Sequence, residues 1–169
     1  SFRIFFGPEG RYETENFIED FLCDWIDIPV CTPEYAATYI TEHGRYHNAH
    51  FLLDKNYNPW SEWFEKVGLE NPGEQATYTS FNETTLCLSA ALAGSGITIG
   101  DSFLCLAAID NGSLVAPLKI GLRSAERYSI CYPKGRNLSK PERDFRKWLT
   151  RTIWEYEQNI TQILSGINI

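Results

Sequence analysis

The sequence of 169 residues predicts an α/β fold, and three observations support this prediction. Short apolar runs typical of buried strands alternate along the chain with segments that have helical periodicity. Glycine, proline and helix-capping residues separate these segments. An apolar fraction of 43%, with 14% aromatic residues, is typical of a folded globular protein. Because strands alternate with helices throughout, we expect a sheet with largely parallel pairing.

Five elements are expected in the first half of the chain. The first is a continuous apolar run that Gly7 and Pro8 end, as expected for a buried strand. Prolines placed for a first helical turn open the two helices, and Gly68 ends the second. The expected elements are a strand at Phe2–Phe6, a strand at Asp20–Cys31, a helix at Pro33–Ile40, a strand at Phe51–Leu53 and a helix from Pro59 to Gly68.

The second half contains two matches to the capping-box pattern, in which a serine is followed three residues later by a glutamate. Ser80 with Glu83 predicts one helix start, and Ser139 with Glu142 predicts the start of a long amphipathic helix. The expected elements are a strand at Ala76–Phe81, a helix to Leu92, a strand at Ile97–Gly100, a helix capped by Asp101 or Ser102 and ending near Asp110, strands at Leu114–Leu118 and Arg127–Tyr132, and the final helix.

Charge and composition exclude several classes of function. A net charge of −7 argues against nucleic-acid binding by this chain itself. No apolar run approaches the roughly 18 residues of a membrane span. Because the sequence has no methionine and no secretion signal, we interpret it as a fragment of a longer protein. The five cysteines are odd in number and form no C-x-x-C pair, which favours buried, reduced thiols in a cytoplasmic protein.

Neither a catalytic group nor a metal site is predicted. His43, His47 and His50 have a spacing that could present three imidazoles on a helix, but the polar segment around them favours a loop with incidental histidines. Gly94 and Gly96 follow a helix and precede a strand, the reverse of a dinucleotide-binding loop. We therefore predict no enzyme activity, no cofactor and no metal.

The polar segment Ser80–Thr85 is the best candidate for a ligand site. Free backbone amides and the helix dipole at a helix start favour an anion or carboxylate, and Thr84 and Thr85 add hydroxyl groups. The alternative is a cap in which Ser80 and Glu83 occupy those amides themselves. The residues alone leave both interpretations open.

Several segments together resemble one family. The segment SFNETTLCLSAALAGSGITIGDSFLCLAAIDNGSLVAPL, at 80–118, is similar to the signature of LysR-type transcriptional regulators, in the branch of the glycine-cleavage activator and the β-lactamase regulator. The segments IPVCTPEY at 28–35, HFLLDKNYNPWSEWFEKVGL at 50–69, and RYSICYPKGR with FRKWL near the end match the same branch. The resemblance covers nearly the whole chain.

The resemblance implies a fold and a division into domains. The fold is α/β and periplasmic-binding-protein-like (type II), with two lobes of which the first is incomplete here. By analogy, residues 1–21 are the end of lobe I and 22–31 form a crossover strand. Residues 32–122 form lobe II, and 123–169 hold the return strand and a C-terminal helix that packs on lobe I.

The resemblance also implies effector-binding residues in the inter-lobe cleft. They are Thr32 after the crossover, Asn82, Thr84 and Thr85 at the helix start, and Tyr128 on the return strand. The family commonly has an arginine where this chain has Phe5, which weakens the expectation of a strongly anionic effector.

The function implied is that of an effector-sensing regulatory domain of a cytoplasmic LysR-type transcription factor. Its expected partners are a small-molecule effector and further copies of itself, with no membrane. DNA would be bound only through an N-terminal winged helix-turn-helix outside this sequence. The alternative is a transport-type solute-binding protein, which would carry a secretion signal instead.

Overall fold

The structure is a computed structural model that describes residues 2–40, 46, 48–55, 58–73 and 76–169. The chain divides into two compact units. The first comprises Ser1–Trp25 and Arg123–Gln162, and the second comprises Ile26–Leu122 and Ile163–Ile169. The chain passes between the units inside strands β2 and β6 and near the end of helix α5.

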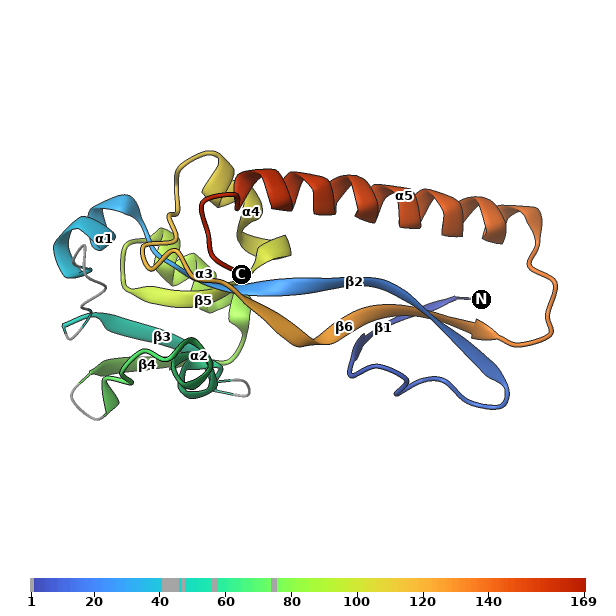
Figure 1. Ribbon diagram of the computed structural model, residues 1–169, viewed down its shortest axis with the longest axis horizontal. Coiled ribbons are helices and arrows are strands. Elements are labelled where there is room, and N and C mark those ends of the chain that lie inside the picture. Colours follow the sequence, from blue (N-terminus) through green and yellow to red (C-terminus); the bar gives the residue numbers. More distant parts are fainter. Residues whose placement is uncertain (1, 41–45, 47, 56–57, 74–75) are drawn as a thin grey trace. The chain divides into compact units, whose positions relative to one another are not determined.

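The elements alternate between strands and helices over most of the chain, as the sequence predicts (Figure 1). In order they are β1 (Arg3–Gly7), β2 (Phe17–Val30), α1 (Pro33–Tyr39), β3 (His50–Asp54), α2 (Trp60–Val67), β4 (Thr77–Phe81), α3 (Thr84–Leu92), β5 (Ile97–Asp101), α4 (Ser102–Asp110), β6 (Leu122–Pro133) and α5 (Lys140–Ile163).

The first unit contains three neighbouring strands in the order β1-β6-β2 and most of the long helix α5. Strand β1 pairs with β6 antiparallel, from Arg3 opposite Cys131 to Gly7 opposite Arg127. Helix α5 contacts this unit through Phe145, whose ring centroid lies 6.0 Å from that of Phe2. Among the residues that the structure describes, no helix is long and apolar enough to cross a membrane.

The second unit has the strand order β2-β5-β3-β4, and its pairing is mixed. Strand β3 runs parallel to both β4 and β5, whereas β2 pairs with β5 antiparallel. The expectation of largely parallel pairing is therefore correct only within β4-β3-β5. The periodicity of a sequence shows which residues face the core but not the direction in which neighbouring strands run, so the antiparallel pairing of β2 is not predicted.

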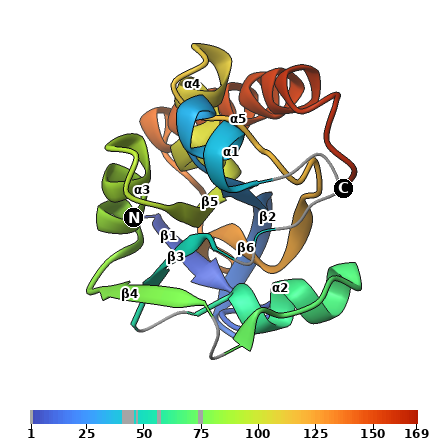
Figure 2. The same ribbon diagram turned by 90° about the vertical axis from the view of Figure 1, so that its left-hand side faces the viewer.

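Helices cover both faces of the sheet in the second unit (Figure 2). Ile97 and Ile99 of β5 belong to the aromatic core that contains α2, whereas Thr98 between them bonds Cys87 of α3. Because successive side chains of a strand point to opposite faces, α2 and α3 lie on opposite sides.

Aromatic side chains of α2 and β3 form the largest part of this core. Trp60, Trp63 and Phe64 are each no more than 2% exposed, as the helical spacing of the sequence predicts. The ring centroid of Phe51 lies 4.8 Å from that of Trp60, in an edge-to-face arrangement. Burying a large apolar side chain stabilises a fold by roughly 1.5–3 kcal/mol, so this cluster is a major source of stability.

The prediction of a strand at Leu114–Leu118 is wrong. This segment forms only an isolated bridge, in which Val115 pairs with Cys31. Pro117 has no backbone N–H to donate to a ladder, and a turn with a positive φ of 51° at Lys119 follows it. Leu114 is nevertheless fully buried, so its apolar character reflects packing rather than strand pairing.

The prediction of a loop with incidental histidines is only partly tested. His43 and His47 lie outside the described residues. His50 is the first residue of β3, and its Nε2 atom lies 2.8 Å from Oγ1 of Thr79 on β4. For His50 the loop prediction is therefore wrong, because strand β3 begins one residue before the apolar run Phe51–Leu53.

All five cysteines are buried and form no disulfide, which confirms the prediction of buried free thiols. Burial raises the pKa of Cys31 and of Cys105 to about 12. The thiolate form is therefore suppressed at these two positions, and they have the character of core residues.

The close approach of β3 to Gly96 gives a test of the fold. A Cβ atom at Gly96 would lie 2.5 Å from the backbone oxygen of His50 and 2.9 Å from Cγ of Leu52. We expect Gly96→Ala to lower the free energy of unfolding by about 2–3 kcal/mol, since a backbone atom cannot move aside without a shift of β3. Urea denaturation followed by circular dichroism measures this.

Gly166→Ala is the matched control, because a Cβ atom there meets nothing within 4 Å and the residue has no positive φ. Equal stability of the two variants would contradict the packing of β5 against β3.

Candidate functional site

The parallel strands β3, β4 and β5 end at the same edge of the sheet. Their last residues are Asp54, Phe81 and Asp101, and the register pairs Asp54 with Phe81. Helix α3 begins shortly after β4, and α4 begins directly after β5. Since ligands of open α/β sheets lie outside the carboxyl ends of the strands, this edge is the candidate ligand site.

Helix α3 begins at Thr84 and not at the predicted cap. Ser80 belongs to β4, where it pairs with Leu53, and the N-cap residue is Glu83, which makes no side-chain capping hydrogen bond. The predicted capping box at Ser80 is therefore wrong. The ladder with β3 continues through Phe81 and holds Ser80 in an extended conformation, so the helix cannot start there.

The consequence is a helix start at which the N-cap residue Glu83 makes no side-chain capping hydrogen bond. Of the two interpretations that the sequence leaves open, the cap satisfied by Ser80 and Glu83 is not formed. The hydroxyl groups are instead held by carboxylates. Oγ1 of Thr84 donates to Oδ2 of Asp54 at 3.2 Å, and Oγ1 of Thr85 donates to Oε2 of Glu83 at 3.5 Å.

A further carboxylate stands at the end of β5. Asp101 caps α4, and its Oδ1 accepts a hydrogen bond of 2.6 Å from the amide of Phe103. In the register of β2 with β5 it lies opposite Asp27, which is only 8% exposed. Burial raises the pKa of Asp101 above its usual value, although the hydrogen bond from Phe103 opposes this.

The edge therefore carries negative charge as well as hydrogen-bond donors. Asp54, Glu83 and Asp101 all lie at strand ends or helix starts, where negative charge is favoured by the helix dipole. These carboxylates oppose a strongly anionic ligand. A ligand with an ammonium group or several N–H donors fits the edge better.

The structure does not bring Thr32 together with Thr84. Thr32 caps α1, and its Oγ1 accepts a hydrogen bond of 3.2 Å from the amide of Tyr35. A Cβ atom at Gly94, just after the end of α3, would lie 3.9 Å from that oxygen. Helix α3 has nine residues, or roughly 14 Å, and Thr84 is at its other end. The observed role of Thr32 is helix capping.

Asn82, Thr84 and Thr85 lie together in the second unit, whereas Tyr128 belongs to the first. Tyr128 is a half-buried residue of β6. Its ring centroid lies 5.4 Å from that of Trp25 and 6.2 Å from that of Phe6. The aromatic contacts hold the Tyr128 ring within its own unit.

Asp101 is predicted as a helix cap, which the structure confirms, but neither Asp54 nor Asp101 is predicted as part of a ligand site. A signal for both exists, because each directly follows an apolar run predicted as a strand. In the part of the chain that the structure describes, no group of three or more histidine, cysteine or acidic side chains could hold a metal ion.

The order of the strands and the helix starts at the carboxyl edge define an open α/β domain, and comparison with known proteins identifies the family. The LysR substrate binding domain family matches residues 4–154. The chain therefore belongs to the LysR substrate binding domain family, and its fold is the periplasmic-binding-protein-like type II fold of that family's solved effector-binding domains.

Curated relatives are transcriptional regulators. The HTH-type transcriptional regulator y4mQ of Sinorhizobium fredii is 30% identical over 140 residues, which are 81% of this chain and 46% of the relative. The HTH-type transcriptional activator AmpR of Enterobacter cloacae is 28% identical over 152 residues, which are 88% of this chain and 49% of the relative. The chain thus spans about half the length of these relatives.

Solved structures show the same fold. The effector binding domain of AmpR from Citrobacter freundii has a TM-score of 0.71 and 21% identity, over 91% of this chain and 74% of that one. The effector domain of AmpR from Pseudomonas aeruginosa has a TM-score of 0.68 and 19% identity, over 92% of this chain and 72% of that one.

The buried carboxylate at the end of β5 gives a prediction about pH. The pKa of Asp101 is raised in the folded state. Ionisation of its carboxyl group therefore costs stability once the pH rises above the ordinary pKa of aspartate in the unfolded chain. Asparagine keeps the capping oxygen without the charge. We expect Asp101→Asn to be more stable than the parent at pH 7, with the difference vanishing at a pH below the ordinary aspartate pKa.

Thermal unfolding at several pH values measures this. Glu15→Gln, which removes an exposed carboxylate, is the control and is expected to leave stability unchanged at every pH. A parent protein that is more stable than Asp101→Asn at pH 7 would contradict the assignment of Asp101 as a partly buried acid whose ionisation costs stability.

Proposed function

We propose that this chain is the effector-sensing regulatory domain of a LysR-type transcription factor. The observation that carries the proposal is the family match over residues 4–154, which agrees with relatives that are HTH-type transcriptional regulators. DNA would be bound by a winged helix-turn-helix in the part of the relatives that this chain does not span. The net charge of −7 supports the proposal that DNA is bound outside this chain, since a DNA-contacting surface is basic.

The proposed domain division follows the family. Residues 1–21 and 123–169 belong to lobe I, residues 32–122 form lobe II, and 22–31 form the crossover between them. The division into two compact units, with chain passages at Trp25–Ile26 and Leu122–Arg123, supports this proposal.

The proposed effector contacts are Asn82, Thr84 and Thr85 of the second unit, with Tyr128 of the first. Support comes from the absence of a side-chain cap by Glu83 at the start of α3 and from the position of Thr84 at the carboxyl edge of the sheet. Thr32 is not included in the proposed site. Its hydroxyl oxygen caps α1 and lies near Gly94, at the opposite end of α3 from Thr84.

The effector is proposed to be polar, with at least one ammonium or amide donor. Asp54 and Glu83 flank the helix start and accept hydrogen bonds from Thr84 and Thr85. An ammonium group could replace these hydroxyl donors, while the N–H groups at the start of α3 would donate to a carbonyl or carboxylate of the same molecule. Amino acids and peptide-like molecules have both groups.

The proposed mechanism is a population shift. An effector that prefers one arrangement of the domain would stabilise that arrangement by its differential affinity, and the change would reach the DNA-binding segment through the oligomer. Assembly into a homo-oligomer and a cytoplasmic location are parts of this proposal. A transport protein or an enzyme is not favoured, because the relatives are transcriptional regulators.

Isothermal titration calorimetry against panels of amino acids, muropeptides and small carboxylates tests the site. We expect one polar ligand to bind, and Thr84→Ala to weaken it about threefold to tenfold, because a hydrogen bond contributes roughly 0.5–1.5 kcal/mol. Tyr128→Ala is expected to weaken binding to a similar extent.

Thr152→Ala is the matched control, since Thr152 is exposed on α5 and belongs to no proposed contact. Binding that both Thr84→Ala and Tyr128→Ala leave unchanged would remove the proposed site, even if the effector itself is found.

A further inference from the structure

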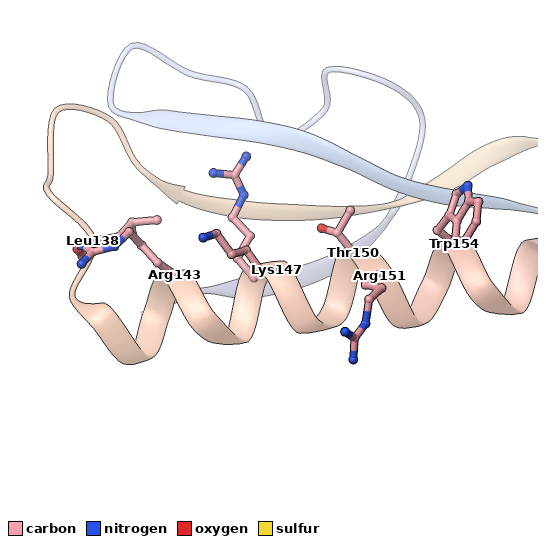
Figure 3. Close-up of a pocket in the computed structure, with 7 residues that line it drawn as sticks. Leu138, Arg143, Lys147, Thr150, Arg151 and Trp154 are labelled. Atoms are coloured by element: carbon pink, nitrogen blue, oxygen red, sulfur yellow. The ribbon is translucent and has the colours of Figure 1, made fainter.

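Helix α5 carries a pocket that lies apart from the edge discussed above. Its volume is about 570 Å³, within the range of small-molecule sites. Figure 3 shows the side chains that line it, all of them in the first unit. They are Leu138, Arg143, Arg146, Lys147, Thr150, Arg151 and Trp154.

The pocket follows one face of the helix. Arg143 and Lys147 are four residues apart, so their side chains form a short row with a rise of about 6 Å between them. In Figure 3, Lys147, Thr150 and Trp154 project to one side of the helix axis, whereas Arg151 projects to the other. Like charges four residues apart destabilise a helix, so the pair of Arg143 and Lys147 costs stability that a bound anion would restore.

This face is not the packing face of the helix. The apolar side chains Phe145, Leu149, Ile153 and Ile160 recur at helical spacing on a side of α5 that adjoins Arg146 but not Lys147 or Trp154. Ile160 is buried, and Phe145 contacts Phe2. Packing within the first unit therefore does not explain the cationic row.

Two arginines in the pocket have structural partners. Arg146 forms an ion pair with Asp20, and its guanidinium lies 5.2 Å from the ring centroid of Tyr132. Arg143 donates a hydrogen bond to the backbone oxygen of Leu138, which uses only part of its guanidinium.

The remaining groups are available to a ligand. Lys147 and Thr150 make no hydrogen bond or ion pair with the described residues. Arg151 pairs with Glu155 at 3.5 Å, but both side chains are mostly exposed and such pairs are weak. Trp154 is 58% exposed and makes no ring contact within the described part of the chain.

We propose that this face of α5 binds a ring-bearing polyanion of the nucleoside phosphate class. Lysine and arginine side chains spaced along a row match charges that are spread along a phosphate chain, and the guanidinium groups favour phosphate oxygens. The hydroxyl group of Thr150 adds a donor. The exposed ring of Trp154 offers a stacking surface for a base. The local excess of positive charge stands out in a chain with a net charge of −7.

Calorimetric titration of the 169-residue chain with adenosine 5′-diphosphate tests the proposal. We expect saturable binding that weakens as salt is added, because the row of cations is exposed. Adenosine and inorganic pyrophosphate are each expected to bind at least about tenfold more weakly, since adenosine lacks the phosphate chain and pyrophosphate lacks the base. Lys147→Gln and Trp154→Ala are each expected to weaken the diphosphate by about tenfold.

Lys134→Gln is the matched control, because it removes an exposed cation outside the pocket and is expected to leave binding unchanged. Thermal unfolding of each variant checks that the fold is kept. Absence of saturable binding, equal binding of pyrophosphate alone, or equal effects of Lys147→Gln and Lys134→Gln would overturn the proposal.

Discussion

The packing of Phe51 against the aromatic side chains of α2 anchors β3 at the centre of the second unit. Phe51 is 1% exposed and contacts the rings of Trp60 and Phe64, while the backbone of the same strand pairs with β4 and β5. Because β3 has a partner on each side, fixing its position fixes where all three parallel strands end. The candidate ligand edge exists only as a consequence of this register.

The chemistry of that edge is set by groups that the strands bring together. Asp54 and Thr84 are 30 residues apart in sequence, and their hydrogen bond links the end of β3 with the start of α3. Asp101 at the end of β5 caps α4 by accepting a hydrogen bond from the amide of Phe103. Two helix starts and several carboxylates thus lie at one edge, which makes a polar ligand with hydrogen-bond donors more suitable than a simple anion.

Helix α5 combines two different faces. One is apolar and packs within the first unit, and the other carries Arg143, Lys147 and Trp154. Its start is stabilised by a capping box, in which the amide of Ser139 donates to Glu142 at 2.9 Å. Bonds from Ser139 lower the pKa of Glu142 to about 2. The start of the helix is thereby stabilised by Ser139 and Glu142, and Lys147 takes no part in this.

The sequence by itself determined the features that depend on neighbouring residues. The helix at Trp60–Val67 and the long helix α5 follow from apolar spacing and local capping, and the buried thiols follow from their apolar surroundings. The family could also be recognised from the sequence, because its signature is the continuous segment at 80–118. Tertiary structure decided the rest, as the two capping boxes illustrate. At Ser139 the carboxylate of Glu142 accepts hydrogen bonds from the serine amide and hydroxyl, whereas the same motif at Ser80 is displaced by the ladder between β4 and β3. Pairing with a distant strand supplies more backbone hydrogen bonds than one local cap can, and no local pattern reveals which distant strand will be present.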